Sequence, residues 1–144
     1  MEAVAKDTRA TVIPTMSYRD AKAAVDWLVR AFGFERHAVY EENGAVMHAE
    51  LSIGNGMVMI GQVNDGAFAK YMAQPDETGG RETQTIFVIV ADADAHYARA
   101  KAAGAEILLD ISDKFYGGRD YTCRDPEGHI WSFGTYDPWT AKPA

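Results

Sequence analysis

The side chains best suited to chemistry lie in one apolar segment of the chain, residues 46–53. His48 and Glu50 stand two positions apart in it. Because side chains alternate in direction along a β-strand, residues two apart project from the same face. A neighbouring histidine and glutamate can transfer protons or anchor a cationic ligand, and they can equally form a structural hydrogen-bonded pair. The pattern predicts a polar pair on one strand face and leaves its role open.

A hairpin extends this face onto the next strand. The sequence GNG at residues 54–56 is a turn signal between two apolar segments. If the turn places Ile53 opposite Met57, residues of both strands share the face of the polar pair. The facing pairs predicted in this way are His48 with Gln62 and Glu50 with Ile60.

Alternation near the C-terminus predicts a second polar face. The segments RDYTCRD and HIWSFGTY interleave polar and apolar side chains with the period of a strand. We expect one face to pack against a helix, and it holds Tyr121, Cys123, His129, Trp131 and Phe133. The polar face is predicted to hold Asp120, Thr122, Arg124, Ile130 and Ser132.

An aromatic loop precedes this second face. Phe115 and Tyr116 stand before two glycines in the sequence FYGG. Aromatic side chains on a flexible backbone suit a loop that folds over a ligand, and they also suit a hairpin turn with an exposed tyrosine. We therefore name Phe115 and Tyr116 as candidate ligand contacts.

The elements that must position these residues occur twice. A strand at residues 11–18 precedes a helix from Asp20 that ends at Gly33, and three strands follow at residues 35–41, 46–53 and 57–63. After a connector with one short helix at residues 67–72, the same order of elements returns. The expected parts are a first unit at 11–63, a connector at 64–83, a second unit at 84–136 and a tail at 137–144, all within one domain.

A nearly constant offset supports a duplication. Asp20 to Asp92 and Gly56 to Gly128 are both 72 residues apart, whereas Gly33 to Gly104 is 71. A duplicated unit keeps one offset throughout, so each half is expected to form a βαβββ unit. By this offset Asp120 is the counterpart of His48.

The amino-acid composition limits the classes of ligand and the cellular compartments that we expect. With 14 basic and 21 acidic residues the net charge is −7, so a nucleic-acid partner is not expected and a cationic small ligand is favoured. Cys123 is the single cysteine, which fits a reducing compartment. The sequence shows neither a membrane span nor a secretion signal. We expect a cytoplasmic protein.

The two βαβββ units and the closing turn DPEGHIWSF resemble the vicinal oxygen chelate superfamily, which includes glyoxalase I, bleomycin-resistance proteins and extradiol dioxygenases. The segments DADAHYARAKAAGAEI and RDPEGHIWSFGTY carry the resemblance, and VMHAELSIGNGMVMIG is similar to its bleomycin-resistance-like or PhnB-like subgroup. The resemblance implies an α+β fold in which two tandem units form curved, mixed, mostly antiparallel sheets around a cleft. It also implies a homodimer.

Metal-using members of this superfamily take one ligand from the first strand and one from the last strand of each unit. By distance from the helix-start aspartates and the turn glycines, the corresponding positions here are Ile13, Ile60, Thr85 and Ser132. None of these side chains is a strong ligand for a divalent ion. A displaced site built from His48, Glu50 and Asp120 is the remaining alternative.

The sequence is consistent with two functions. The resemblance together with the missing ligands favours a non-catalytic protein without a metal or other cofactor, which sequesters a cationic or aromatic small molecule in its cleft. The alternative is a lyase, isomerase or dioxygenase that uses relocated metal ligands at His48 and Glu50, or a metal-free enzyme with Glu50 as general base.

Overall fold

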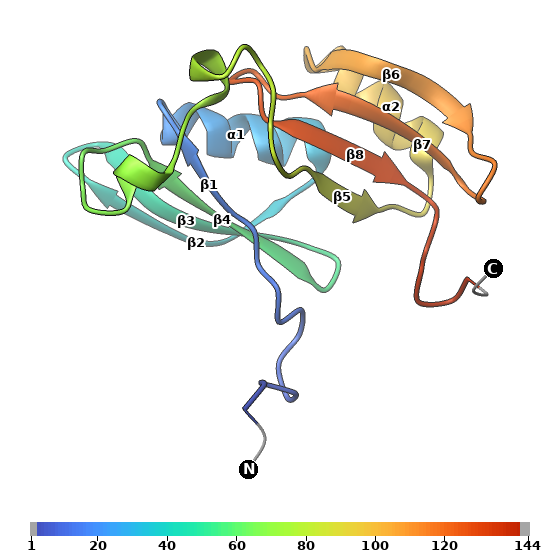
Figure 1. The fold of residues 1–144 in the computed structure, drawn as a ribbon, viewed down its shortest axis with the longest axis horizontal. Helices are drawn as coiled ribbons and strands as arrows, with labels where there is room; N and C mark the ends of the chain where they lie inside the picture. The colour runs from blue at the N-terminus through green and yellow to red at the C-terminus, as the bar shows by residue number, and fades with distance from the viewer. Residues whose placement is uncertain (1–2, 142–144) are drawn as a thin grey trace. The chain divides into compact units, whose positions relative to one another are not determined.

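A computed structural model describes residues 3–141, and the chain divides into two compact units, Met1–Gln74 and Pro75–Ala144. Each unit holds a four-stranded sheet and one α-helix (Figure 1). The α+β fold of two tandem βαβββ units with mixed, mostly antiparallel sheets is therefore confirmed. No helix among the described residues is long and apolar enough to cross a membrane.

The first unit contains β1 (Thr15–Tyr18), α1 (Ala21–Phe32), β2 (Glu35–Glu42), β3 (Ala45–Ile53) and β4 (Gly56–Gln62). Its strand order is β1-β4-β3-β2, in which β1 runs parallel to β4 and the other pairs are antiparallel. The first strand is shorter than predicted and begins directly after Pro14, where proline lacks the N–H that a ladder needs. A 3-10 helix at Ala69–Tyr71 follows, within the predicted short helix.

The second unit repeats this topology. A 3-10 helix at Pro75–Glu77 precedes β5 (Ile86–Ile89), α2 (Ala93–Ala102), β6 (Glu106–Asp113), β7 (Arg119–Arg124) and β8 (Ile130–Gly134). The strand order is β5-β8-β7-β6, again with a parallel pair between the first and last strands. Both helices begin in the same way, because the side chains of Asp20 and Asp92 each accept a hydrogen bond from the backbone N–H three residues later, at 3.0 Å.

The two helices bury different amounts of apolar surface against their sheets. Seven residues of α1 are buried, among them Trp27, Leu28 and Phe32, whereas only Ala93 and Ala100 of α2 are. In the second unit the sheet supplies the bulk of the core, since Tyr121, Cys123, Trp131 and Phe133 all have 0% exposure. The core positions predicted for these four residues are confirmed, whereas His129 lies in the turn before β8, with its Nδ1 2.8 Å from Oε1 of Glu82.

His96 also belongs to this second core. The position of His96 in the helical sequence DADAHYARAKAAG predicts a solvated side chain, but its ring stacks on Phe133 with centroids 4.1 Å apart. Its Nδ1 lies 2.6 Å from the hydroxyl of Tyr121. The expectation of a solvated histidine was wrong, because a helix with few large apolar residues uses the imidazole ring to cover the sheet.

The register between β3 and β4 differs from the prediction by one residue. Ile53 pairs with Gly56 rather than with Met57, because only Gly54 and Asn55 form the turn. Gly54 supplies the positive φ, 55°, that a two-residue hairpin requires. A one-residue shift moves every side chain of a strand to the other face, so Ile60 and Gln62 leave the face that holds His48 and Glu50.

Candidate functional site

In the first unit, one sheet face is turned away from the buried residues that pack with α1. Cross-strand partners share a face, so the observed register identifies its members. We call this face the first open face. It consists of Thr15 and Ser17 on β1, Met57, Met59 and Gly61 on β4, His48, Glu50 and Ser52 on β3, and Glu35, Ala38 and Tyr40 on β2.

The predicted polar pair lies on this face. Nε2 of His48 is 3.1 Å from Oε2 of Glu50, and their side chains are 40% and 27% exposed. The ring of Tyr40, on the neighbouring strand β2, stacks on the imidazole with centroids 5.8 Å apart. The pair is therefore oriented by its neighbours and open to solvent, which suits a carboxylate that receives a cationic group.

Two predicted partners of this pair lie elsewhere. Ile60 is opposite Ala49 and has 0% exposure, so it belongs to the helix-packed core. Oε1 of Gln62 accepts a hydrogen bond from the backbone N–H of Ala21 at 3.0 Å, and its Nε2 donates to the carbonyl of Arg19. Gln62 thus satisfies backbone groups at the start of α1. The residues opposite His48 and Glu50 are Gly61 and Met59.

The second unit has an equivalent face, and here the predicted alternation is confirmed. β7 pairs Thr122 with Ser132 and Arg124 with Ile130, and the hydroxyls of Thr122 and Ser132 are 2.7 Å apart. We call this face the second open face. It consists of Phe87 and Ile89 on β5, Ile130, Ser132 and Gly134 on β8, Asp120, Thr122 and Arg124 on β7, and Glu106, Leu109 and Ser112 on β6.

Asp120 is the most enclosed polar residue of the second open face, at 7% exposure. Its Oδ2 accepts a hydrogen bond from the hydroxyl of Tyr116 at 2.8 Å, and its Oδ1 lies 3.3 Å from Nζ of Lys114. The hydrogen bond to Asp120, followed by burial, raises the pKa of Tyr116 above its usual value. Tyr116 is therefore tied to the strand, whereas the side chain of Phe115 is fully exposed.

Arg124 is occupied by structural partners. Its Nη1 lies 2.6 Å from Oε2 of Glu106, and its Nη2 donates to the carbonyl of Gly80 at 3.1 Å. The guanidinium thereby joins β6 and the segment before β5 to the end of β7. Arg124 thus has two side-chain hydrogen bonds committed to the fold, as many as Gln62.

Sequence reasoning missed the other residues of this region, which are Phe87, Ile89, Glu106, Leu109, Ser112, Lys114 and Gly134. Phe87 and Ile89 lie in a segment that was predicted only as a strand, and they are 43% and 44% exposed because β5 presents only alternate residues to the core. Lys114 lies one residue beyond β6. The alternation of β5 was the available signal for the first two, and nothing in the local sequence marks Lys114.

In metal-using members of the superfamily that the sequence resembles, the first and last strands of each unit supply the metal ligands. Here these strands, β1 with β4 and β5 with β8, offer only weak ligands at the facing positions. Thr15 of β1 faces Met59 of β4, and Phe87 of β5 faces Ser132 of β8. Ile13 and Thr85, the positions inferred from spacing, lie just before these strands. Thioether, hydroxyl and hydrocarbon groups are weak ligands for hard divalent ions. Within residues 3–141, no three histidine, cysteine or acidic side chains come together in a group that could hold a metal ion.

Burial also lowers the reactivity of the single cysteine, Cys123. Cys123 has 0% exposure, and burial, followed by repulsion from Asp125, raises the pKa of its thiol from 9.0 to about 12. A thiol with this pKa carries little thiolate near neutral pH and is a poor nucleophile. Its place in the core agrees with the prediction of a small buried residue.

Known proteins resemble the chain over most of its length. TioX from Micromonospora sp. ML1 has a solved structure with a TM-score of 0.69 and 38% identity, covering 85% of this chain and 94% of TioX. An uncharacterised protein of Mycobacterium tuberculosis is 31% identical over 134 residues, which are 92% of this chain and 78% of that protein.

A solved lactoylglutathione lyase from Agrobacterium tumefaciens shares the fold, with a TM-score of 0.59 and 18% identity over 90% of this chain and 95% of the lyase. The family model for the Glyoxalase/Bleomycin resistance protein/Dioxygenase superfamily matches residues 12–133. This match covers both βαβββ units. The chain therefore belongs to the glyoxalase/bleomycin resistance protein/dioxygenase superfamily.

Proposed function

We propose that this protein binds a small organic ligand on its open sheet faces and acts without a metal ion, in the manner of bleomycin-resistance-type sequestering proteins. The observation that carries the proposal is the pair of facing residues in each unit, Thr15 with Met59 and Phe87 with Ser132. These are the strands that supply metal ligands in relatives, and here they supply apolar surface and hydroxyl groups. Such surfaces bind organic molecules better than they bind divalent ions.

The carboxylate on the first open face leads us to expect a positively charged ligand. Glu50 is partly exposed beside His48, and Met57 and Met59 provide polarisable apolar surface next to the carboxylate. With a net charge of −7 the whole chain attracts cations. A ligand that combines an aromatic body with an ammonium group fits this arrangement.

A titration with 2-naphthylmethylamine tests this function. We expect the amide resonances of residues on the first open face to shift in the ¹⁵N-labelled protein, whether or not EDTA is present. Replacing Glu50 by Gln removes the charge that faces the ammonium group and should weaken binding by about 1–3 kcal/mol. The matched control is Glu42→Gln, an exposed glutamate at the end of β2, which should leave the affinity unchanged.

Elemental analysis separates this function from a metal enzyme. The contact between His48 and Glu50 is the observation that favours relocated ligands. If protein purified without added metal contains one divalent ion per chain, and His48→Ala removes that ion, the sequestering function is wrong. Assembly as a homodimer belongs to the same proposal, and light scattering of the purified protein measures it.

A further inference from the structure

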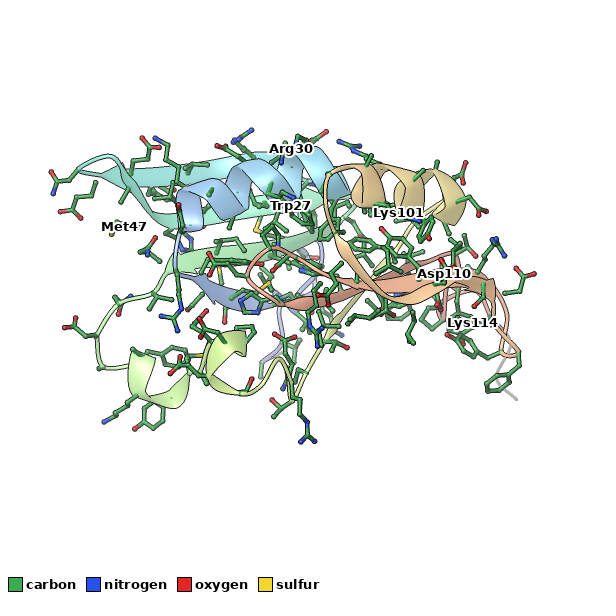
Figure 2. All side chains as sticks on the ribbon, turned by 90° about the horizontal axis from the view of Figure 1, so that it is seen from above. Trp27, Arg30, Met47, Lys101, Asp110 and Lys114 are labelled. Carbon is green, nitrogen blue, oxygen red and sulfur yellow. The ribbon has the colours of Figure 1, made fainter. Side chains whose placement is uncertain are left out.

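The ammonium group of Lys114 is held in place at the edge of the second open face. Figure 2 shows Lys114 where β6 gives way to the loop before β7. Its Nζ donates to the hydroxyl of Ser112 at 3.0 Å and lies 3.3 Å from Oδ1 of Asp120. An ammonium group has three protons, so two are directed to these partners. One donor remains for a ligand, and the side chain is 23% exposed.

The charges around the ammonium group of Lys114 favour an uncharged hydrogen-bond acceptor on the ligand. The carboxylate of Asp120 neutralises the ammonium group and would repel an anion placed next to it. A cation would be repelled by Lys114 itself. The hydroxyl of Ser112, which accepts from Lys114, still has its own proton to donate. Two converging donors in a neutral setting match the two lone pairs of a carbonyl oxygen.

An apolar surface borders these donors on the same face. Gly134 lies between Ile89 and Asp120 in the sheet. The ring of Phe87 covers it, because a Cβ added at Gly134 would lie 3.1 Å from that ring. Both Phe87 and Ile89 remain more than 40% exposed. A planar ring that rests on Phe87 and Ile89 would thus lie next to the carboxylate end of the polar group.

Tyr116 forms the other wall. Its ring packs edge to face against Tyr136, with centroids 5.3 Å apart, and its hydroxyl is fixed by Asp120. The side chain is 48% exposed. Because the hydroxyl is committed to Asp120, Tyr116 offers mainly the surface of its ring, which favours an aromatic neighbour.

We propose that Lys114 and Ser112 form a subsite for the carbonyl oxygen of an uncharged aromatic ligand, such as an aromatic amide, with Phe87, Ile89 and Tyr116 around the ring. This inference rests on the proposed function, since it assumes that the open faces hold the ligand. It adds a second recognition chemistry to the one expected at Glu50: a neutral carbonyl in one unit and a cation in the other.

Titration of the ¹⁵N-labelled protein with 2-naphthamide tests the subsite. Binding should shift the amide resonances of residues 112–120 and 132–134. Lys114→Met should weaken binding about tenfold, as expected for loss of a hydrogen bond from a charged donor, and Lys114→Arg should restore most of the affinity. The probes 2-naphthoate and 2-naphthylmethylamine should bind this region at least several-fold more weakly than the amide does.

Two further variants guard against trivial explanations. Ser112→Ala leaves the pair of Lys114 and Asp120 in place and should still weaken 2-naphthamide binding a few-fold. Lys101→Met removes an exposed lysine of α2 (Figure 2) and should change nothing. Thermal unfolding of each variant shows whether it is folded.

The outcomes distinguish the two proposals. If 2-naphthylmethylamine binds in a Glu50-dependent manner but 2-naphthamide leaves residues 112–120 unshifted, the carbonyl subsite is wrong and the proposed function stands. Equal affinity of Lys114→Met and the unaltered protein for the amide also overturns the subsite. If none of the three naphthalene probes binds, both proposals are wrong.

Discussion

Glu50 and Thr122 lie 72 residues apart on equivalent strands, and their surroundings differ. Glu50 is next to His48 on β3, whereas Thr122 bonds to Ser132 and has Asp120 two residues before it. The backbone pairing is the same in both units, since Glu50 faces Met59 and Thr122 faces Ser132. One scaffold therefore carries a cation-attracting carboxylate in the first unit and a neutral group of donors and hydroxyls in the second.

The turns that close the two hairpins also differ. Two residues, Gly54 and Asn55, connect β3 to β4. Five residues, from Asp125 to His129, connect β7 to β8. Between equivalent strand pairs the difference is one residue, because four residues separate Ser52 from Met57 and five separate Arg124 from Ile130. Met59 and Ser132 are therefore 73 residues apart, although the preceding strands keep an offset of 72. The longer turn is also internally bonded, because the buried carboxylate of Asp125 holds it together.

Of the substitutions predicted below, loss of the Asp125 carboxylate should lower the free energy of unfolding most. Oδ1 of Asp125 accepts hydrogen bonds from the backbone N–H groups of Glu127 and His129, both at 3.1 Å, and Oδ2 accepts from Nε1 of Trp131 at 3.0 Å. Asp125→Ala removes these acceptors and should lower the free energy of unfolding by about 2–3 kcal/mol, as measured by urea denaturation.

The matched change in the first unit is Asn55→Ala, at an exposed position of the shorter turn. It should alter the free energy of unfolding by less than about 0.5 kcal/mol. Equal losses for Asp125→Ala and Asn55→Ala would show that the side-chain bonds of the longer turn contribute nothing specific.

The equivalent glycines of β4 and β8 should respond in opposite ways to a methyl group. A Cβ at Gly134 would lie 2.5 Å from Cβ of Asp120 and 3.1 Å from the ring of Phe87, whereas one at Gly61 would have no neighbour closer than 3.9 Å. Gly134→Ala should therefore lower the free energy of unfolding by about 2 kcal/mol through overpacking. Gly61→Ala should leave it unchanged or raise it by a few tenths of a kcal/mol.

Differential scanning calorimetry of the two alanine variants measures this contrast. A Gly134→Ala protein as stable as the unaltered one would mean that Phe87 moves aside without loss. The position of Phe87 over Gly134 would then not be fixed by packing.

Raising the pH should produce the smallest of the predicted differences in stability between the two units. Cys123 and Leu51 occupy equivalent core positions, 72 residues apart and both with 0% exposure. Burial raises the pKa of Cys123 from 9.0 to about 12, so the thiol ionises in the unfolded chain before it does so in the folded protein. Its contribution to stability is complete below pH 9 and is lost as pH rises towards 12, by roughly 1 kcal/mol at pH 10.

Urea denaturation at pH 8 and pH 10, with Cys123→Val as the comparison, measures this loss. The variant should decline less than the unaltered protein over this interval. The remaining decline includes Tyr121, whose pKa burial also raises above its usual value of 10.0. Parallel declines in the two proteins would contradict the assigned pKa of Cys123.

Much of the fold and half of the site could be predicted from sequence. Alternation assigned Asp120, Thr122, Arg124 and Ser132 to one face because polar side chains alternate with Tyr121 and Cys123 in β7, and Ser132 stands between Trp131 and Phe133 in β8. The same reasoning misplaced Ile60 and Gln62. Both faces of β4 are largely apolar, with Met57 and Met59 on one and Val58 and Ile60 on the other, so the turn length alone sets its register. Lys114 could not be predicted, because its role depends on contacts with Asp120 across the β6–β7 hairpin.

The parallel pairing inside each unit sets an order for folding. Thr15 of β1 pairs with Met59, 44 residues later, and Ile86 of β5 pairs with Trp131, 45 residues later. Closing such a distance carries an entropic penalty that helices and hairpins avoid. We therefore expect α1 and the β2–β3–β4 meander to form before β1 docks. Because the long closure of the first sheet ends at β4, that sheet can be completed while the second unit is still being synthesised.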